Sequence, residues 1–240
     1  MNDSGDDSGQ RGGNPNRPPF ASPFSFTDLN HPSSHGHTRY GGHRSEGDTP
    51  FSLYLGKKYG SECFAVDPTR KHAAALRKLE ETVPGFNFLP VAVGAKTGTT
   101  EFFESNVNIS GSLMSNHRNV RNDPGVSYQV EVLSINDLLK RVGCRKVALL
   151  KLDIEGAEFD LLNSLRREHL RPIAQILVEF HHDTVVGYTE THFREVLRHM
   201  SNLGMTCHVY DGRDCLFYWD VLSQLVPQRV HDWLGRNVEK

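Results

Sequence analysis

Acidic side chains gather directly after the most apolar stretch of the sequence. Asp153, Glu155 and Glu158 lie within one six-residue stretch around Gly156, and Lys151 stands two positions before Asp153. Carboxylates this close raise one another's pKa unless a cation is near, and such crowding marks functional sites more often than packing. A sulfonium group, a divalent metal or Lys151 could supply the positive charge. The alternative is a strand-to-helix turn whose acids favour the helix dipole.

A second polar group follows the next apolar run. Glu179 and His181 alternate on one face of the expected strand end, and His182 and Asp183 follow. A histidine there could serve as general base for a hydroxyl, because its ordinary pKa lies near neutrality. A metal cluster of Glu179, His181 and Asp183 is conceivable, but no matching ligand spacing occurs elsewhere, so we assign no metal site. Ordinary polar residues at a strand end remain the alternative.

A third candidate, Asp67, follows the short apolar run that begins at Cys63. An acidic residue at the end of such a strand can accept both hydroxyl hydrogens of an adenosine ribose, since a carboxylate is an acceptor only. The alternative is a helix N-cap before Pro68 and Thr69.

The elements that must position these residues follow an alternating pattern. From Thr49 onward, short β-branched or aromatic runs alternate with longer amphipathic stretches, which is typical of βαβ units. The resulting fold class is α/β, with a mostly parallel sheet of the doubly wound kind. The main expected strands are 63–67, 86–93, 147–153 and 173–180, and the main expected helices follow Thr49, Pro68, Gly156 and Thr191.

Two further strand pairs complete the prediction. Residues 99–103 and 128–135 bracket a polar loop, and a loop of that length is more often functional or mobile than structural filler. Residues 206–210 and 215–219 flank a hairpin turn at 211–214, so the sheet must end with an antiparallel strand. This ending favours the methyltransferase variant of the doubly wound sheet over a dinucleotide dehydrogenase.

The first 48 residues differ from the rest of the chain. They are dominated by small and polar residues, and residues 31–50 contain no Val, Ile, Leu, Met or Phe. Such a segment cannot bury enough apolar surface to offset its ordering entropy. We therefore expect a disordered low-complexity tail over residues 1–48 and one domain over residues 49–240.

Composition excludes several classes of protein. With 27 Lys and Arg against 29 Asp and Glu, the formal charge of -2 argues against nucleic acid as a partner. No apolar run suits a membrane helix or secretory signal, so we expect no membrane partner and a cytoplasmic location. The four cysteines form no CxxC pair, and the motifs of serine hydrolases, P-loop NTPases and zincins are absent.

Three segments together resemble one known family. Residues 64–69 (FAVDPT), 149–158 (LLKLDIEGAE) and 175–182 (QILVEFHH) are similar to the FkbM family of S-adenosylmethionine-dependent methyltransferases. The resemblance covers about residues 47–217. It implies a Rossmann-like methyltransferase fold, S-adenosylmethionine as cofactor, and O-methylation of a hydroxyl on a small molecule or sugar.

The resemblance also implies roles for individual residues. The catalytic candidates are Asp153, Glu155, His181 and Glu179. The cofactor-binding candidates are Asp67, Gly47, Asp48, Val91 and Asp153. In this assignment Asp67 holds the ribose, Asp153 and Glu155 lie near the methyl donor or acceptor, and Glu179 and His181 face the acceptor. The loop over residues 105–127 would select the acceptor.

One departure from the family pattern concerns the first strand. It should precede the helix at Phe51, yet residues 40–48 (YGGHRSEGD) contain no apolar run. We therefore expect this strand to be missing or degenerate. The rival hypothesis is a methyltransferase-like domain with weak or no activity that acts in binding or interaction.

Overall fold

The described part of the chain folds into an α/β structure built from three sheets and the helices beside them. The computed structural model describes residues 53–54, 58–107, 111–121, 125–210 and 212–220. Its helices are α2 (Arg70–Thr82), α3 (Arg118–Arg121), α4 (Ile135–Arg141), α5 (Glu158–Ser164), α6 (Arg167–Leu170) and α7 (Glu190–Asn202). None of the helices in these ranges is long and apolar enough to cross a membrane.

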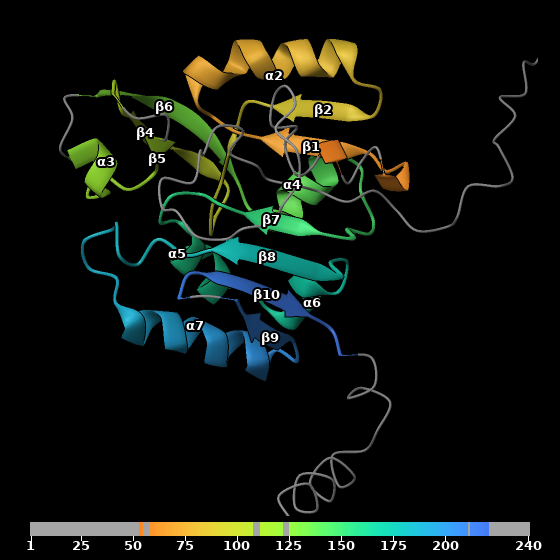
Figure 1. Cartoon of the computed structure of the whole chain (residues 1–240), viewed down its shortest axis with the longest axis vertical. Helices are drawn as coiled ribbons and strands as arrows, with labels where there is room; N and C mark the ends of the chain where they lie inside the picture. The colour runs from red at the N-terminus through yellow and green to blue at the C-terminus, as the bar shows by residue number, and fades with distance from the viewer. Residues whose placement is uncertain (1–52, 55–57, 108–110, 122–124, 211, 221–240) are drawn as a thin grey trace, which may run out of the picture.

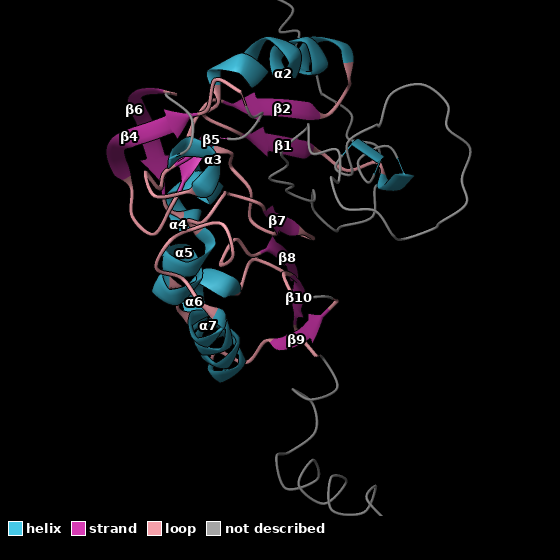
Figure 2. Cartoon of the chain, turned by 60° about the vertical axis from the view of Figure 1, so that its left-hand side comes forward, coloured by secondary structure: helices cyan, strands magenta, loops and turns pink. Residues whose placement is uncertain are grey.

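Two of the sheets carry the elements expected of the wound sheet. In the first, β1 (Cys63–Val66) pairs in parallel with β2 (Phe86–Leu89). The second has the order β7 (Leu150–Leu152), β8 (Gln175–Glu179), β10 (Asp214–Tyr218) and β9 (Thr206–Val209). In Figures 1 and 2 the second sheet lies below the first, with β1 and β7 as the facing strands but separated from each other, and α5, α6 and α7 cover one face of the second sheet.

The third sheet stands at the edge where β1, β7 and β8 end (Figure 1). It has the order β3 (Ala92–Val93), β6 (Val126–Leu133), β4 (Gly98–Glu104) and β5 (Gly111–Ser112). The β4 and β6 strands come from the segments predicted to bracket the polar loop, and they pair antiparallel over seven residue pairs. The loop itself supplies β5 and α3.

The expectation of a mostly parallel sheet is wrong for the described residues. Three of their seven strand pairings are parallel, and four are antiparallel. The reason lies in β4 and β6, which leave many side chains exposed, as an antiparallel sheet permits and a buried parallel sheet does not. No described strand joins β1 to β7, so a single Rossmann sheet is not confirmed.

Several predicted elements differ in length from the observed ones. The strand expected over 86–93 is divided into β2 and β3 around Pro90, which has no N–H to donate to a ladder. The helix expected after Gly156 ends at Ser164, and α6 follows as a separate turn. The C-terminal antiparallel hairpin is confirmed by the pairing of β9 with β10. The tail over 1–48 and the first strand lie outside the described residues.

The largest core cluster lies between the second sheet and its helices. Leu152 of β7 and Val178 of β8 face this core and are fully buried, as is Phe159 of α5. The residues that alternate with them, Lys151 and Glu179, point to the opposite face and are only partly covered. This one-sided burial determines which side chains of β7 and β8 face away from the core.

A matched pair of substitutions tests this core. We expect Val178→Ala to lower the free energy of unfolding by about 2 kcal/mol, because it removes two buried methyl groups and leaves a cavity. Val126→Ala makes the same change on β6, where the side chain is 52% exposed, and should cost less than about 0.5 kcal/mol. Urea unfolding of both variants measures the difference, and equal losses would contradict the packing described.

Candidate active site

Asp67 lies directly after β1, where its carboxylate is held by the start of α2. Its Oδ1 accepts the Thr69 backbone N–H at 2.8 Å, and its Oδ2 lies 2.7 Å from His72 Nδ1. Thr69, and not Asp67, is the N-cap residue of α2. The side chain of Asp67 is therefore buried and oriented by two contacts at the end of the strand, without being the cap itself.

The turn between β7 and α5 is built around Glu158, whose side chain is fully buried. Its Oε1 accepts the Ile154 N–H and its Oε2 accepts the Gly156 N–H, both at 2.9 Å. The turn needs two left-handed residues, Glu155 with φ 51° and Gly156 with φ 106°. A carboxylate that satisfies two backbone donors compensates for this strained geometry, and the turn aims Asp153 and Glu155 at the strand edge.

His181, from the end of β8, contacts all three carboxylates of this turn. Its Nδ1 donates to Glu158 Oε1 at 2.9 Å, and its Nε2 lies 3.6 Å from Glu155 Oε2 and 3.7 Å from Asp153 Oδ1. On the outer sides, Lys151 Nζ lies 3.2 Å from Asp153 Oδ2, and His117 Nε2 lies 3.0 Å from Glu155 Oε2. Asp153, Glu155 and His181 are hereafter called the acidic cluster.

Charge determines the protonation of His181. Burial lowers its pKa, but the nearby carboxylates of Glu158, Glu155 and Asp153 raise it more strongly, to about 10. His181 is therefore an imidazolium at neutral pH in this arrangement. An imidazolium cannot accept a proton, so this raised pKa does not favour the general-base role predicted for His181.

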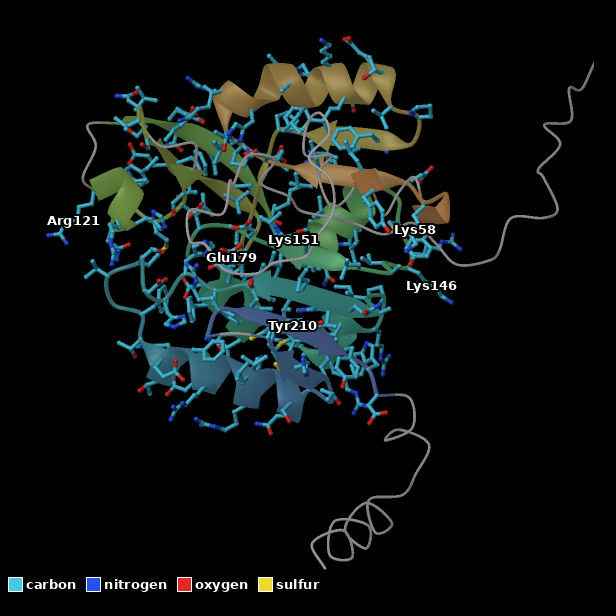
Figure 3. The ribbon with its side chains drawn as sticks, in the orientation of Figure 1. Lys58, Arg121, Lys146, Lys151, Glu179 and Tyr210 are labelled. Carbon is cyan, nitrogen blue, oxygen red and sulfur yellow. The ribbon has the colours of Figure 1, made fainter. Side chains whose placement is uncertain are left out.

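Glu179 lies beside the acidic cluster and outside it. Its partner across the ladder is Asp214 on β10, and Figure 3 shows it on β8 near Lys151 of β7. Burial, together with the charges of Asp153 and Asp214, raises its pKa, while His181 and Lys151 oppose that increase. Glu179 therefore interacts electrostatically with Asp153 and His181 of the cluster.

One cavity brings Asp67 together with Asp153 and Glu155. Its volume is about 50 Å³, and its other walls are Thr69 and His72 at the start of α2 together with mainly apolar residues of β1, β3, β4 and the segment after β5. Cofactor pockets usually enclose about 300 to 1,000 Å³. The three carboxylates therefore share one hollow, and that hollow is narrower in this structure than a bound nucleoside requires.

The remaining candidates lie elsewhere. Val91 is buried in the hydrophobic core, whereas its neighbours Ala92 and Val93 line the cavity. Gly47 and Asp48 lie outside the described residues.

Sequence reasoning missed two histidines of the site. His72 lies on the first turn of α2, five residues after Asp67, a spacing that can bring a helix side chain back to the preceding strand end. His117 comes from the segment between β5 and α3, and nothing in its spacing indicates a contact with Glu155. The loop of residues 105–127 was nevertheless predicted to be functional, and it is the loop that carries His117.

Comparison with known proteins identifies the family. Residues 21–207 match the family model described as the methyltransferase FkbM domain. The chain therefore belongs to the FkbM methyltransferase family, as the three sequence segments predicted. The match begins inside the segment predicted as a tail.

Other comparisons add less. No curated protein matches the chain. Among solved structures, a methyltransferase FkbM from Methylobacillus flagellatus KT is similar, with 13% sequence identity and a TM-score of 0.41. The similarity covers 83% of this chain and 44% of that chain, so the present chain spans less than half the length of that relative.

The turn after β7 can be tested through Gly156. A Cβ at this position would lie 2.3 Å from Val185 Cγ2, and the φ of 106° is itself unfavourable for other residues. We expect Gly156→Ala to destabilise the chain by at least about 2 kcal/mol. Gly143→Ala is the control, because its φ is also positive and nothing lies within 4 Å of its Cβ, so it should lose only about 1 kcal/mol.

Adding Val185→Ala to Gly156→Ala should recover the part of the loss that comes from crowding, while the backbone strain remains. Thermal unfolding of the single and double variants separates the two contributions. No recovery in the double variant would show that Val185 does not pack against the turn.

Proposed function

We propose that the chain transfers a methyl group from S-adenosylmethionine to a hydroxyl on a small molecule or sugar. Membership of the FkbM methyltransferase family supports the methyl transfer. The structural observation that carries the proposal is the shared cavity of Asp67, Asp153 and Glu155 at the carboxyl ends of β1 and β7. Ligands of open α/β folds bind at this edge.

The residues around the cavity fit the chemistry of the cofactor. Both oxygens of Asp67 are already hydrogen-bonded, but a carboxylate has about four acceptor positions, so two remain for the ribose hydroxyls. Val66, Ala92 and Phe102 provide apolar walls for a base, and Asp153 and Glu155 provide negative charge near a sulfonium. When bound, S-adenosylmethionine supplies an activated methyl group on a cationic sulfur.

The role of the chain in this reaction is mainly alignment. Methyl transfer is an in-line displacement, so holding donor and acceptor in line accounts for much of the acceleration. Negative side chains near the sulfur favour the charged donor over its neutral product, which promotes product release. Because the cavity encloses only about 50 Å³, its walls must separate to admit the cofactor.

A larger hollow on the same side suits the acceptor. It encloses about 420 Å³ between α3 and residues 182–188. His117 precedes α3 and pairs with Val185, and His182 follows His181, so this hollow adjoins the acidic cluster on two sides. Arg118 and Arg121 line it, which favours a polar acceptor, and α3 belongs to the loop predicted to select that acceptor.

A second candidate function is that of a methyltransferase-like binding or interaction domain, which transfers no methyl group and binds the cofactor weakly or not at all. Two observations favour it: the narrowness of the cavity, and the absence of any described strand between β1 and β7. In the wound sheet of methyltransferases that strand is central and its loop cradles the methionine part of the cofactor. A domain without it would keep the acidic cluster as structure and bind the cofactor poorly.

Calorimetric titration with S-adenosylhomocysteine distinguishes the two candidates. The methyltransferase proposal predicts micromolar binding that weakens at least about tenfold in Asp67→Asn, since the variant loses a charged acceptor for the ribose. Asparagine retains an acceptor for the Thr69 N–H, so the start of α2 is preserved. Asp160→Asn, an exposed change on α5, is the matched control and should bind like the original chain. Absence of binding by the folded original chain would support the second candidate instead.

A further inference from the structure

We propose that Asp153, Glu155 and His181 form a binding site for a divalent cation such as Zn²⁺, with three protein ligands and one position open to a further oxygen ligand. Each residue offers one ligand atom, and these atoms lie within 4.8 Å of one another. All three side chains are buried, at the junction between the cofactor cavity and the hollow beside α3.

The distances suit an ion better than direct hydrogen bonds. His181 Nε2 lies 3.6 Å from Glu155 Oε2 and 3.7 Å from Asp153 Oδ1, which is too long for an N–H···O bond. Two ligands bound to one Zn²⁺ at about 2.1 Å, with an angle between tetrahedral and trigonal, are about 3.4 to 3.6 Å apart. The two separations from His181 therefore match those of ligands around one ion, and the ligand atoms of all three residues lie within 4.8 Å of one another.

Neighbouring residues orient each ligand toward that point. The Nδ1–H of His181 is bound by Glu158 Oε1 at 2.9 Å, which leaves Nε2 to face the two carboxylates. The ring is an imidazolium only while the cluster holds no ion, because a bound cation displaces the Nε2 proton and Nε2 then coordinates as a neutral imidazole. A carboxylate behind the distal ring nitrogen is the usual partner of a metal-binding histidine. Glu158 is itself fixed by two backbone N–H groups of the turn. The orientation of His181 thus does not depend on the ion.

Asp153 provides an independent observation. Lys151 binds its Oδ2 at 3.2 Å, whereas its Oδ1 is buried and has no hydrogen-bond partner. A buried carboxylate oxygen without a hydrogen bond is costly, and a cation in the cluster would satisfy it. His117, close to Glu155 Oε2, positions the third ligand from the side of α3.

The ligand set indicates the class of ion. Two carboxylates and one imidazole suit a first-row divalent ion such as Zn²⁺, whereas Mg²⁺ prefers an octahedron of oxygen ligands. If the proposed methyl transfer is correct, an acceptor hydroxyl at the open position would be polarised and held between the two hollows. That consequence rests on the proposed function, whereas the ion site itself does not.

The test measures metal binding without cofactor or acceptor. After dialysis against a chelator, the full chain is titrated with Zn²⁺ by calorimetry and with Co²⁺ by visible absorption. The proposal predicts that the cluster binds one metal ion per chain. With Co²⁺ this ion should show the strong visible bands of four-coordinate Co²⁺ with nitrogen and oxygen ligands. Absence of these bands in the folded chain would overturn it.

Variants locate the ion. His181→Gln and Asp153→Asn should each weaken this binding at least about 100-fold and abolish the visible bands. His208→Gln, an exposed change on β9, is the control and should retain both. The histidines of the N-terminal segment are identical in all variants, so any Zn²⁺ or Co²⁺ that they bind contributes equally to each titration. If the two cluster variants bind Zn²⁺ and Co²⁺ like the control, the ion lies elsewhere and the proposal is wrong.

Thermal unfolding provides a second readout that does not depend on activity. Zn²⁺ should raise the unfolding midpoint of the original chain and of His208→Gln, but not of Asp153→Asn, because only a native-state ligand stabilises the fold. When the titration with S-adenosylhomocysteine is carried out in the presence of a chelator, a failure of this ion site leaves its result unaffected. The two proposals can therefore fail separately.

Discussion

The buried carboxylate of Glu158 connects the two strands that build the site. It accepts two backbone N–H groups in the turn after β7 and one ring N–H from His181 after β8. A fully buried charge is stable only when its hydrogen-bonding capacity is used, and here three donors use it. The positions of Asp153, Glu155 and His181 all follow from this single side chain, since the first two lie in the turn and the third is its partner.

The same arrangement concentrates negative charge at one edge of the fold. Asp67 adds a further carboxylate across the cavity, from a different sheet. Lys151 and the imidazolium of His181 neutralise part of this charge but not all of it. Such an edge favours a cationic ligand over a neutral one, and a sulfonium cofactor and a divalent cation both meet this condition. The cavity and the acidic cluster share Asp153 and Glu155, so binding of one cation should influence the other.

Much of this site could be predicted from the sequence, for a local reason. The strand β7 stands out as an apolar run, and the acids follow it so closely that any strand-to-helix turn would place them at one edge. The second sheet and its hairpin were predictable for the same reason, because their strands are short, apolar and punctuated by turns. These features are determined by residues close together in the sequence, and over such short stretches the hydrophobic periodicity indicates the secondary structure.

Other features depend on contacts between distant segments. His117 reaches Glu155 only because β5 and α3 fold back beside the turn, and Ser112 fixes that approach through the Glu155 carbonyl. The strands β4 and β6 pair antiparallel in a separate sheet. The alternation of apolar and polar residues along a strand indicates which face is buried, but not which other strand it pairs with. The acidic cluster was likewise not predicted as a metal site, since its ligands come from two strand ends and show no ligand spacing in the sequence.

The most direct measurement is a crystal structure of the chain with S-adenosylhomocysteine bound. If the carboxylates after β1 and β7 form one cofactor site, the walls of the present cavity will have separated, with the ribose at Asp67 and the sulfur on the side of Asp153 and Glu155. A ligand bound away from these residues, with the cavity still closed, would contradict the account.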